Sequence, residues 1–150
     1  MKKIALSLIA VFGLLGARAA DLEWLTDLPQ AKSQAKAENK LVLMDFTGSD
    51  WCPPCKQLKK NVFSSTEFAT FAKANLVLVE VDFPKTKKEI EKQSAELKKA
   101  NEALSRKFDI EAFPTIVVLG PNGKQLSKEA GYDGSSAKDF VAKLEKFTKK

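Results

Sequence analysis

Histidine is absent from this 150-residue chain, and cysteine occurs only twice. The first absence excludes catalytic triads that need an imidazole and metal sites built on histidine ligands. Two cysteines are also too few for a four-cysteine zinc site. We therefore expect no metal and no bound cofactor, and any thiol chemistry must come from a single pair of cysteines.

The chain also lacks a large excess of charge of one sign. It has 25 basic and 19 acidic residues, a formal charge of +6, and three of the positive charges (Lys2, Lys3 and Arg18) lie near the N-terminus. Without them the excess is about +3, which is too small to favour nucleic acid as a partner. Internal repeats and linkers are absent too. The length suits one domain with a real core.

The first 19 residues have the pattern of a secretory signal peptide. Lys2 and Lys3 form a basic start, residues 4–15 are apolar, and Ala17-Arg18-Ala19 resembles a cleavage site with small residues at both key positions. Alternatives are an uncleaved anchor and a buried N-terminal helix. We predict a signal peptide at 1–19, a domain at 20–150, and an exported product, periplasmic or otherwise secreted, with no stable membrane anchor after cleavage.

Both cysteines lie in the stretch Trp51-Cys52-Pro53-Pro54-Cys55-Lys56. An apolar run at 41–46 precedes it and a helical pattern follows it, so the pair is predicted at a helix start, as in dithiol redox sites. Residues three apart on a helix share a face, so the sulfurs can form or release a disulfide without backbone rearrangement. The helix N-terminus favours thiolate. In an oxidising compartment, however, such a pair could be merely a structural staple.

The rest of the chain alternates helices with apolar strands. Apolar runs and turn signals predict strands at 41–46, 76–81, 116–119 and 124–130, the last two joined by a Gly-Pro-Asn-Gly turn. Helices are predicted to end at 39–40, to run from 52 to 61 or 63, to restart at 64–67, and to follow Ser135 or Ser136. The first two strands should be parallel and the last two antiparallel.

A charge-rich segment separates the second and third predicted strands. Beneath its charges, apolar residues recur at helical spacing at Ile90, Leu97, Ala100, Leu104 and Phe108. The pattern predicts a solvated amphipathic helix, or two with a break, lying over the sheet. The alternative is a docking surface for an acidic partner.

Taken together, the element order and motifs resemble the thioredoxin family, and specifically its exported thioredoxin-like branch. The resemblance rests on Asp45-Phe46, the Trp51–Lys56 motif, Val81-Asp82, Phe113-Pro114-Thr115 and the Gly-Pro-Asn-Gly turn. It implies an α/β thioredoxin-like fold, with a central mixed sheet of about four strands flanked by helices. The charged segment, residues 84–107, becomes a helical insert before the strand that follows a cis-proline.

The resemblance also implies roles for the site residues. Cys52 corresponds to the more exposed nucleophile and Cys55 to the thiol that resolves the mixed disulfide. Pro114 corresponds to the cis-proline. Trp51 would shield the site and shape the docking surface, unless it serves only for packing. The residues implied to bind substrate are Trp51, Pro53, Pro54, Phe113, Pro114 and Thr115.

Asp45 resembles the buried acid that handles a proton for the resolving cysteine. A carboxyl on an apolar strand should have a raised pKa. Asp45 lies seven residues before Cys52, one more than in the usual pattern, so the loop at 47–50 carries an extra residue. An alternative is a structural carboxylate satisfied by loop amides. Leu78 near a position often occupied by lysine and the long charged segment are two further departures.

These observations predict an exported thiol–disulfide oxidoreductase that exchanges disulfides with protein substrates and with an unidentified redox partner. The sequence leaves the direction of electron flow open. A non-catalytic binding module with a structural disulfide and a reductant for cytochrome c maturation are the alternatives. Direct copper handling is disfavoured, because there is no histidine and no methionine near the cysteines.

Overall fold

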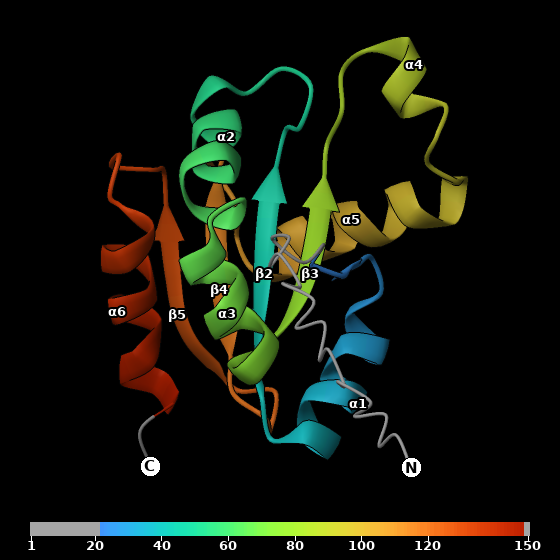
Figure 1. Cartoon of the computed structure of the whole chain (residues 1–150). Helices are drawn as coiled ribbons and strands as arrows, with labels where there is room; N and C mark the ends of the chain where they lie inside the picture. The colour runs from blue at the N-terminus through green and yellow to red at the C-terminus, as the bar shows by residue number, and fades with distance from the viewer. Residues whose placement is uncertain (1–21, 149–150) are drawn as a thin grey trace, which may run out of the picture.

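A computed structural model describes residues 22–148, which form a mixed sheet with helices on both faces (Figure 1). The predicted signal peptide, 1–19, lies outside the described residues. The five strands are ordered β1-β3-β2-β4-β5. Their bounds are Trp24–Leu25 for β1, Leu41–Thr47 for β2, Leu76–Asp82 for β3, Thr115–Leu119 for β4 and Gln125–Ala130 for β5.

Strand directions follow the predicted pattern. β2 and β3 are parallel, whereas β4 is antiparallel to both β2 and β5. A turn from Gly120 to Lys124 joins β4 to β5, and Gly123 within it has a φ of 79°. That conformation is open to glycine without steric cost. The predicted hairpin and the predicted parallel pair are both confirmed.

The sheet has one strand more than the four expected from the sequence. β1 is only two residues long, and it pairs in parallel with β3 through Trp24 opposite Leu78 and Leu25 opposite Val79. Two residues are too few to produce a recognisable alternation, so the sequence pattern gave no sign of this strand.

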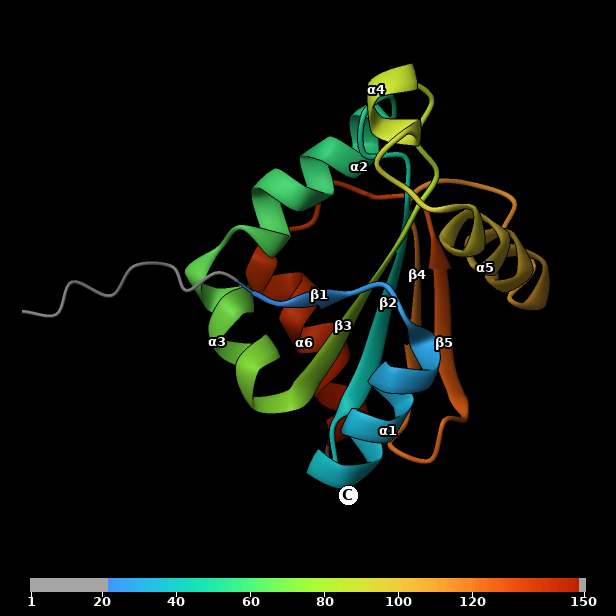
Figure 2. The same ribbon diagram turned by 90° about the vertical axis from the view of Figure 1, so that its right-hand side faces the viewer.

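Helices cover the two faces unequally. The helical elements are α1 (Leu28–Glu38), α2 (Pro53–Leu58), the π-helix η1 (Lys59–Phe63), α3 (Thr66–Asn75), α4 (Lys87–Ile90), α5 (Ala95–Lys107) and α6 (Ala137–Thr148). Figure 2 shows α2, α3 and α6 on one side of the sheet and α1 and α5 on the other. Among the residues described, no helix is long and apolar enough to cross a membrane.

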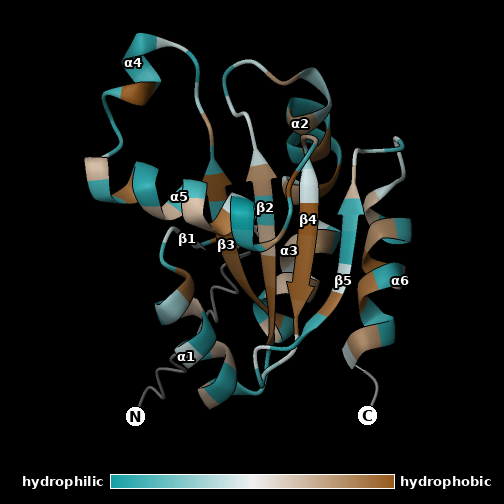
Figure 3. Cartoon of the chain, turned by 180° about the vertical axis from the view of Figure 1, so that it is seen from behind, coloured by the Kyte–Doolittle hydropathy of each residue, from teal (hydrophilic) through white to brown (hydrophobic). Residues whose placement is uncertain are grey.

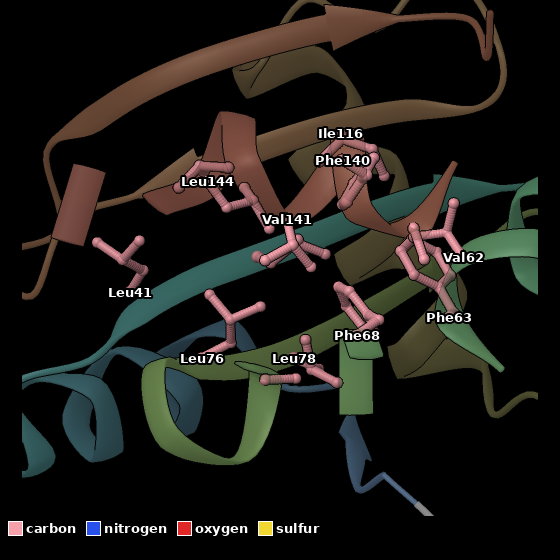
Figure 4. Packing of buried hydrophobic residues seen from close by; sticks show 14 of the residues in the cluster. Leu41, Val62, Phe63, Phe68, Leu76, Leu78, Ile116, Phe140, Val141 and Leu144 are labelled. Carbon is pink, nitrogen blue, oxygen red and sulfur yellow. The ribbon is translucent and has the colours of Figure 1, made fainter. Parts of the chain in front are cut away.

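The core is divided by the sheet, because successive residues of a strand point to opposite faces. Leu41 and Leu43 of β2 join a cluster with α3 and α6 (Figure 4), and Val42 and Met44 join a second cluster on the α1 side. The central strands β2, β3 and β4 are mostly brown in Figure 3, as buried strands should be. Asp45 continues the odd-numbered series, so it faces α2, α3 and α6.

The charged insert forms two helices with a break, as one of the sequence interpretations anticipated. Its predicted apolar stripe is wrong at one position: Ala100 is exposed, and its neighbour Asn101, which is 2% exposed, faces the interior instead. The Asn101 amide donates to the backbone oxygen of Asp82 at 3.0 Å. This hydrogen bond sets which face of α5 turns inward.

Candidate redox site

The two cysteines form a disulfide at the start of α2, at the upper edge of the sheet in Figure 1. Cys52 is the residue that caps the helix, and its sulfur accepts a hydrogen bond from the amide of Cys55 at 3.3 Å. Pro53 and Pro54 occupy the first helical turn, where amide donors have no partner within the helix. The Cα atoms of Cys52 and Cys55 are 5.3 Å apart. The geometry is that of a disulfide set directly on a helix N-terminus.

Exposure does not distinguish the two cysteines in the way that the family resemblance implied. Cys52 is 2% exposed and Cys55 is 5% exposed, so the expectation of a more exposed Cys52 is wrong for this disulfide form. The capping position draws the Cys52 sulfur toward the helix amides. What distinguishes Cys52 is that hydrogen bond, which stabilises negative charge on its sulfur when the pair is reduced.

Asp45 lies on β2, on the face of the sheet that α2 covers. It is 7% exposed, and its Oδ1 is buried without a hydrogen-bond partner. Burial, reinforced by the charges of Glu80 and Asp82 and opposed by Lys59, raises the pKa of Asp45 to about 8. The expectation of a raised pKa is confirmed. The alternative, a structural carboxylate satisfied by loop amides, is not supported, because Oδ1 accepts no hydrogen bond.

Sequence reasoning missed two charged neighbours of Asp45. Glu80 pairs with Asp45 in register across β3 and β2, and burial raises the pKa of Glu80 as well. Lys59, on η1, lowers the pKa of both carboxyls. The signal for Glu80 was present in the sequence, since it interrupts an otherwise apolar strand.

The peptide bond between Phe113 and Pro114 is cis, as the resemblance implied. Pro114 is buried, and its carbonyl accepts from the amide of Gly131 at 2.7 Å. Thr115 is also buried, with its hydroxyl donating to the carbonyl of Ala112 at 2.7 Å. The Thr115 side chain therefore supports this loop from beneath.

The other residues implied to bind substrate lie nearer the surface. Pro53 is exposed, and Pro54, Trp51 and Phe113 are partly exposed. The rings of Trp51 and Phe113 meet edge to face with centroids 5.8 Å apart, and Phe113 packs against Phe83 with centroids 5.4 Å apart. The structure thus brings Trp51 and the cis-proline loop together.

A set of hydrogen bonds that the sequence did not predict joins the loop before Cys52 to the chain after β3. The Asp50 carboxylate accepts from the amides of Lys85 at 3.1 Å and Thr86 at 2.7 Å. The Asp82 carboxylate accepts from the amide of Ser49 at 2.9 Å and from its hydroxyl at 2.6 Å. We call these contacts, which join Asp50 to Lys85 and Thr86 and Asp82 to Ser49, the clasp. They connect the loop with the extra residue to the start of the charged insert.

The part of the chain that the structure describes contains no cluster of side chains suited to a metal ion. Within residues 22–148 there is no group of three or more cysteine, aspartate or glutamate side chains that could hold a metal ion. The chemistry that the arrangement supports is thiol–disulfide exchange, because it combines a hydrogen-bonded sulfur at a helix N-terminus with a buried acid on the strand beneath.

Comparison with known proteins agrees with this geometry. A family model described as a thioredoxin-like domain matches residues 28–148. The chain is 32% identical over 126 residues to the disulfide bond reductase DsbH of Chlamydia pneumoniae, covering 84% of this chain and 72% of that protein. It is 26% identical over 117 residues to the thioredoxin-related protein DsbJ of the same organism, covering 78% of this chain but only 32% of DsbJ.

Solved structures agree as well. A structure of the DsbH oxidoreductase superposes with a TM-score of 0.77 at 29% identity, covering 93% of both chains. A thioredoxin from Thermus thermophilus, 20% identical, has a TM-score of 0.62 and covers 83% of this chain and 85% of its own. That second likeness supports the fold alone. The chain therefore belongs to the thioredoxin family, in its thiol–disulfide oxidoreductase branch.

Proposed function

We propose that the protein is an exported thiol–disulfide oxidoreductase that reduces disulfides in protein substrates through Cys52 and Cys55. The observation that carries the proposal is the Cys52 sulfur at the N-terminus of α2, where it accepts the Cys55 amide. A thiolate at that position is stabilised by the amide and the helix dipole, which favours it as the attacking nucleophile.

Exchange proceeds in two displacements. The Cys52 thiolate attacks one sulfur of the substrate disulfide, and the other substrate sulfur leaves as a thiolate. Cys55 then loses its proton and attacks the Cys52 sulfur, which breaks the mixed disulfide and releases the second substrate sulfur. Two electrons pass to the substrate, and the chain is left with the Cys52–Cys55 disulfide. No metal or organic cofactor is needed.

Asp45 is the group that we propose receives the Cys55 proton. It faces the helix that carries Cys55, and no protein group bonds its Oδ1. With a pKa of about 8, the carboxyl exists in both protonation states near neutral pH and can accept or return a proton there. A carboxyl with an ordinary pKa would lack the basicity for this step.

The reductive direction and protein substrates are supported by similarity to DsbH, which is named a disulfide bond reductase. The equilibrium constant of the Cys52–Cys55 couple against glutathione tests this direction. A potential near that of thioredoxin, about −270 mV, is expected for a reductant. A value near −120 mV, typical of strong periplasmic oxidants, would contradict it.

Trapping the mixed disulfide tests the chemistry itself. A Cys55→Ser variant retains the attacking thiol but lacks the resolving one. With insulin as the substrate, whose disulfides Cys52 attacks, it should accumulate a mixed disulfide. The matched Cys52→Ser variant should trap nothing and lose at least about 1,000-fold in insulin reduction. If neither variant traps substrate and the wild type fails to reduce insulin, the disulfide is structural and the chain is a binding module.

Export rests on the sequence of residues 1–19. Expression of the full chain in a Gram-negative host, followed by fractionation and N-terminal sequencing, should yield a periplasmic protein that begins at Ala20. Replacing Ala17 and Ala19 with bulky residues should block that processing. Recovery of an unprocessed chain from the cytosol in both cases would count against export.

A further inference from the structure

The indole of Trp51 is held on several sides, and two of its contacts come from the chain that follows β3. Its Nε1 donates to the carbonyl of Phe83 at 2.7 Å, and the Lys85 ammonium lies 3.7 Å from the ring centroid. Phe113 meets the ring edge to face. On the loop side the ring lies so close to Gly48 that a Cβ there would collide with it. Trp51 therefore has little freedom while these contacts last.

The clasp fixes the segment that supplies the Phe83 and Lys85 contacts. Asp50, adjacent to Trp51, accepts from the amides of Lys85 and Thr86 and so holds that segment against the loop. Desolvation would raise the pKa of Asp50, but the hydrogen bonds from Thr86 and Lys85 outweigh it and lower the pKa to about 2. The carboxylate therefore remains ionised at working pH, and its hydrogen bonds are of the stronger, charge-assisted kind.

Two side chains of the insert bind the backbone carbonyl of Asp82, whose carboxylate is part of the clasp. The carbonyl oxygen of Asp82 accepts from Gln93 at 3.1 Å and from Asn101 at 3.0 Å, while its carboxylate holds Ser49. Asp82 thus connects the insert to the loop before Cys52. Hydrogen bonds through Asp82 therefore link the charged segment to the loop that precedes the redox site.

The disulfide also has anchors besides these contacts. Cys52 and Cys55 are held by the turn from Gly48 and by the first turn of α2, whose Leu58 belongs to the apolar core. A protein partner must approach the nearly buried Cys52 sulfur past the surface that Trp51 and Phe113 form. Loss of the clasp should therefore disturb docking of a protein more than the reactivity of the thiols.

We propose that Asp50 is a positioning residue for protein substrates, which joins the insert to the loop before Cys52 and keeps Trp51 seated beside the disulfide. The inference rests on the proposed function and deepens it. It gives the extra loop residue and the insert a shared role in selecting protein disulfides over small ones.

The test compares two disulfide substrates in Asp50→Ala, Asp50→Asn and the wild type. For Asp50→Ala, kcat/KM for insulin should fall about tenfold, mainly through KM, because a misplaced docking surface weakens productive binding. The rate with hydroxyethyl disulfide, a small neutral substrate, should stay within about twofold. Asp50→Asn keeps one acceptor oxygen and should give an intermediate loss. The control is Asp109→Asn, at an exposed carboxylate that faces Lys128.

Trp51 fluorescence provides a readout that does not depend on activity. In a Trp24→Phe background, Asp50→Ala should shift the emission of Trp51 to longer wavelength, because the indole gains solvent, and Asp109→Asn should not. Gly48→Ala, which displaces the ring from its other side without touching Asp50, should reproduce both the shift and the selective loss on insulin.

Two results would overturn the proposal. One is an Asp50→Ala variant with unchanged emission and unchanged insulin reduction. The other is an equal loss on both substrates, which would mean that the thiols themselves are disturbed. A wild type that is inactive on both substrates would refute the proposed function instead, and the emission of Trp51 would still decide whether Asp50 holds it.

Discussion

The two faces of the sheet differ in how their outer helices are attached. On the α2, α3 and α6 face, aromatic residues such as Phe63, Phe68 and Phe140 pack on one another and on the strands (Figure 4). On the α1 and α5 face, α5 contributes one fully buried side chain, and it is the polar Asn101. Each face has an apolar cluster, but on the second face the charged insert is also joined to the end of β3 by hydrogen bonds from Gln93 and Asn101 to the Asp82 carbonyl.

This difference separates two tasks. The dithiol and Asp45 belong to the apolar face, where packing fixes side chains closely and burial shifts a pKa. The clasp and the insert lie nearer solvent, and a small number of hydrogen bonds join them to the loop before Cys52 and to the end of β3. The redox chemistry therefore depends on apolar packing, and the surface that meets the partner depends on a few specific hydrogen bonds. The following predictions test this comparison.

The largest expected effect is a cavity on the apolar face. Phe68 is fully buried, with ring centroids 5.0 Å from Phe63 and 6.0 Å from Phe140. Phe68→Ala should lower the free energy of unfolding by about 3–5 kcal/mol, measured by urea denaturation. Phe108→Ala is the matched change on the other face and should cost less. A Phe108→Ala cost equal to or above that of Phe68→Ala would break the comparison.

A pH-dependent effect should follow from Asp45. Its pKa rises from 3.8 to about 8 on folding, so between these values the folded chain binds more protons than the unfolded chain. Its contribution to stability is therefore full at low pH and is lost as the pH rises through 8. Asp45→Asn should remove this loss and raise the free energy of unfolding at pH 9, relative to the wild type, by roughly 3 kcal/mol.

Urea denaturation at several pH values, with the exposed Asp109→Asn change as control, measures this effect. The oxidised protein should be used throughout, so that the thiols do not titrate. A wild type and an Asp45→Asn variant with the same decline in stability from pH 5 to pH 9 would show that Asp45 is not the group responsible.

A smaller effect is expected where the insert is attached. Asn101→Ala removes a buried hydrogen bond to the Asp82 carbonyl and should cost about 1–2 kcal/mol of unfolding free energy. Gln93 donates to the same oxygen from a less buried position, so Gln93→Ala should cost less. The two variants are compared by thermal and urea unfolding. A reversed order would mean that the turn between α4 and α5 anchors the insert more strongly than α5 itself.

The smallest effect concerns two helix caps of equal geometry. Ser65 accepts from the amide of Phe68 at the start of α3, and Ser94 accepts from that of Leu97 at the start of α5, both at 3.1 Å. Ser65→Ala should lower global stability by about 1 kcal/mol. Ser94→Ala should instead speed hydrogen exchange of α5 amides with little change in the global midpoint. Equal global losses would mean that α5 unfolds together with the core.

Much of the fold followed from local pattern. Apolar runs located β2, β3 and β4, a Gly-containing turn located the β4–β5 hairpin, and a helix restart was placed at 64–67, where Ser65 proves to be the cap. These features depend on neighbours in the sequence, so a single chain is enough to recognise them. The cysteine pair and the raised pKa of Asp45 were predictable for the same reason, since a carboxyl in an apolar strand must lose solvent.

The clasp could not be recognised in this way. Asp50 and Thr86 are 36 residues apart, and no periodicity marks that one will bond the amide of the other. The choice between Ala100 and Asn101 as the inward residue depended on a carbonyl at the end of β3. The low exposure of Cys52 likewise depends on the seating of its sulfur at the helix start, which spacing alone does not give.

The chemical nature of the clasp has a consequence for how its two halves can vary. On the insert side, Asp50 is met by backbone amides, which every residue except proline provides. Exchanging Lys85 or Thr86 therefore keeps these amide hydrogen bonds and removes only the Lys85 contact with the Trp51 ring or the Thr86 side-chain hydrogen bond, whereas position 50 requires a short side chain with acceptor oxygens. Mutational tolerance should thus be higher at Lys85 and Thr86 than at Asp50, which lets the surface chemistry beside the disulfide vary while its support is retained.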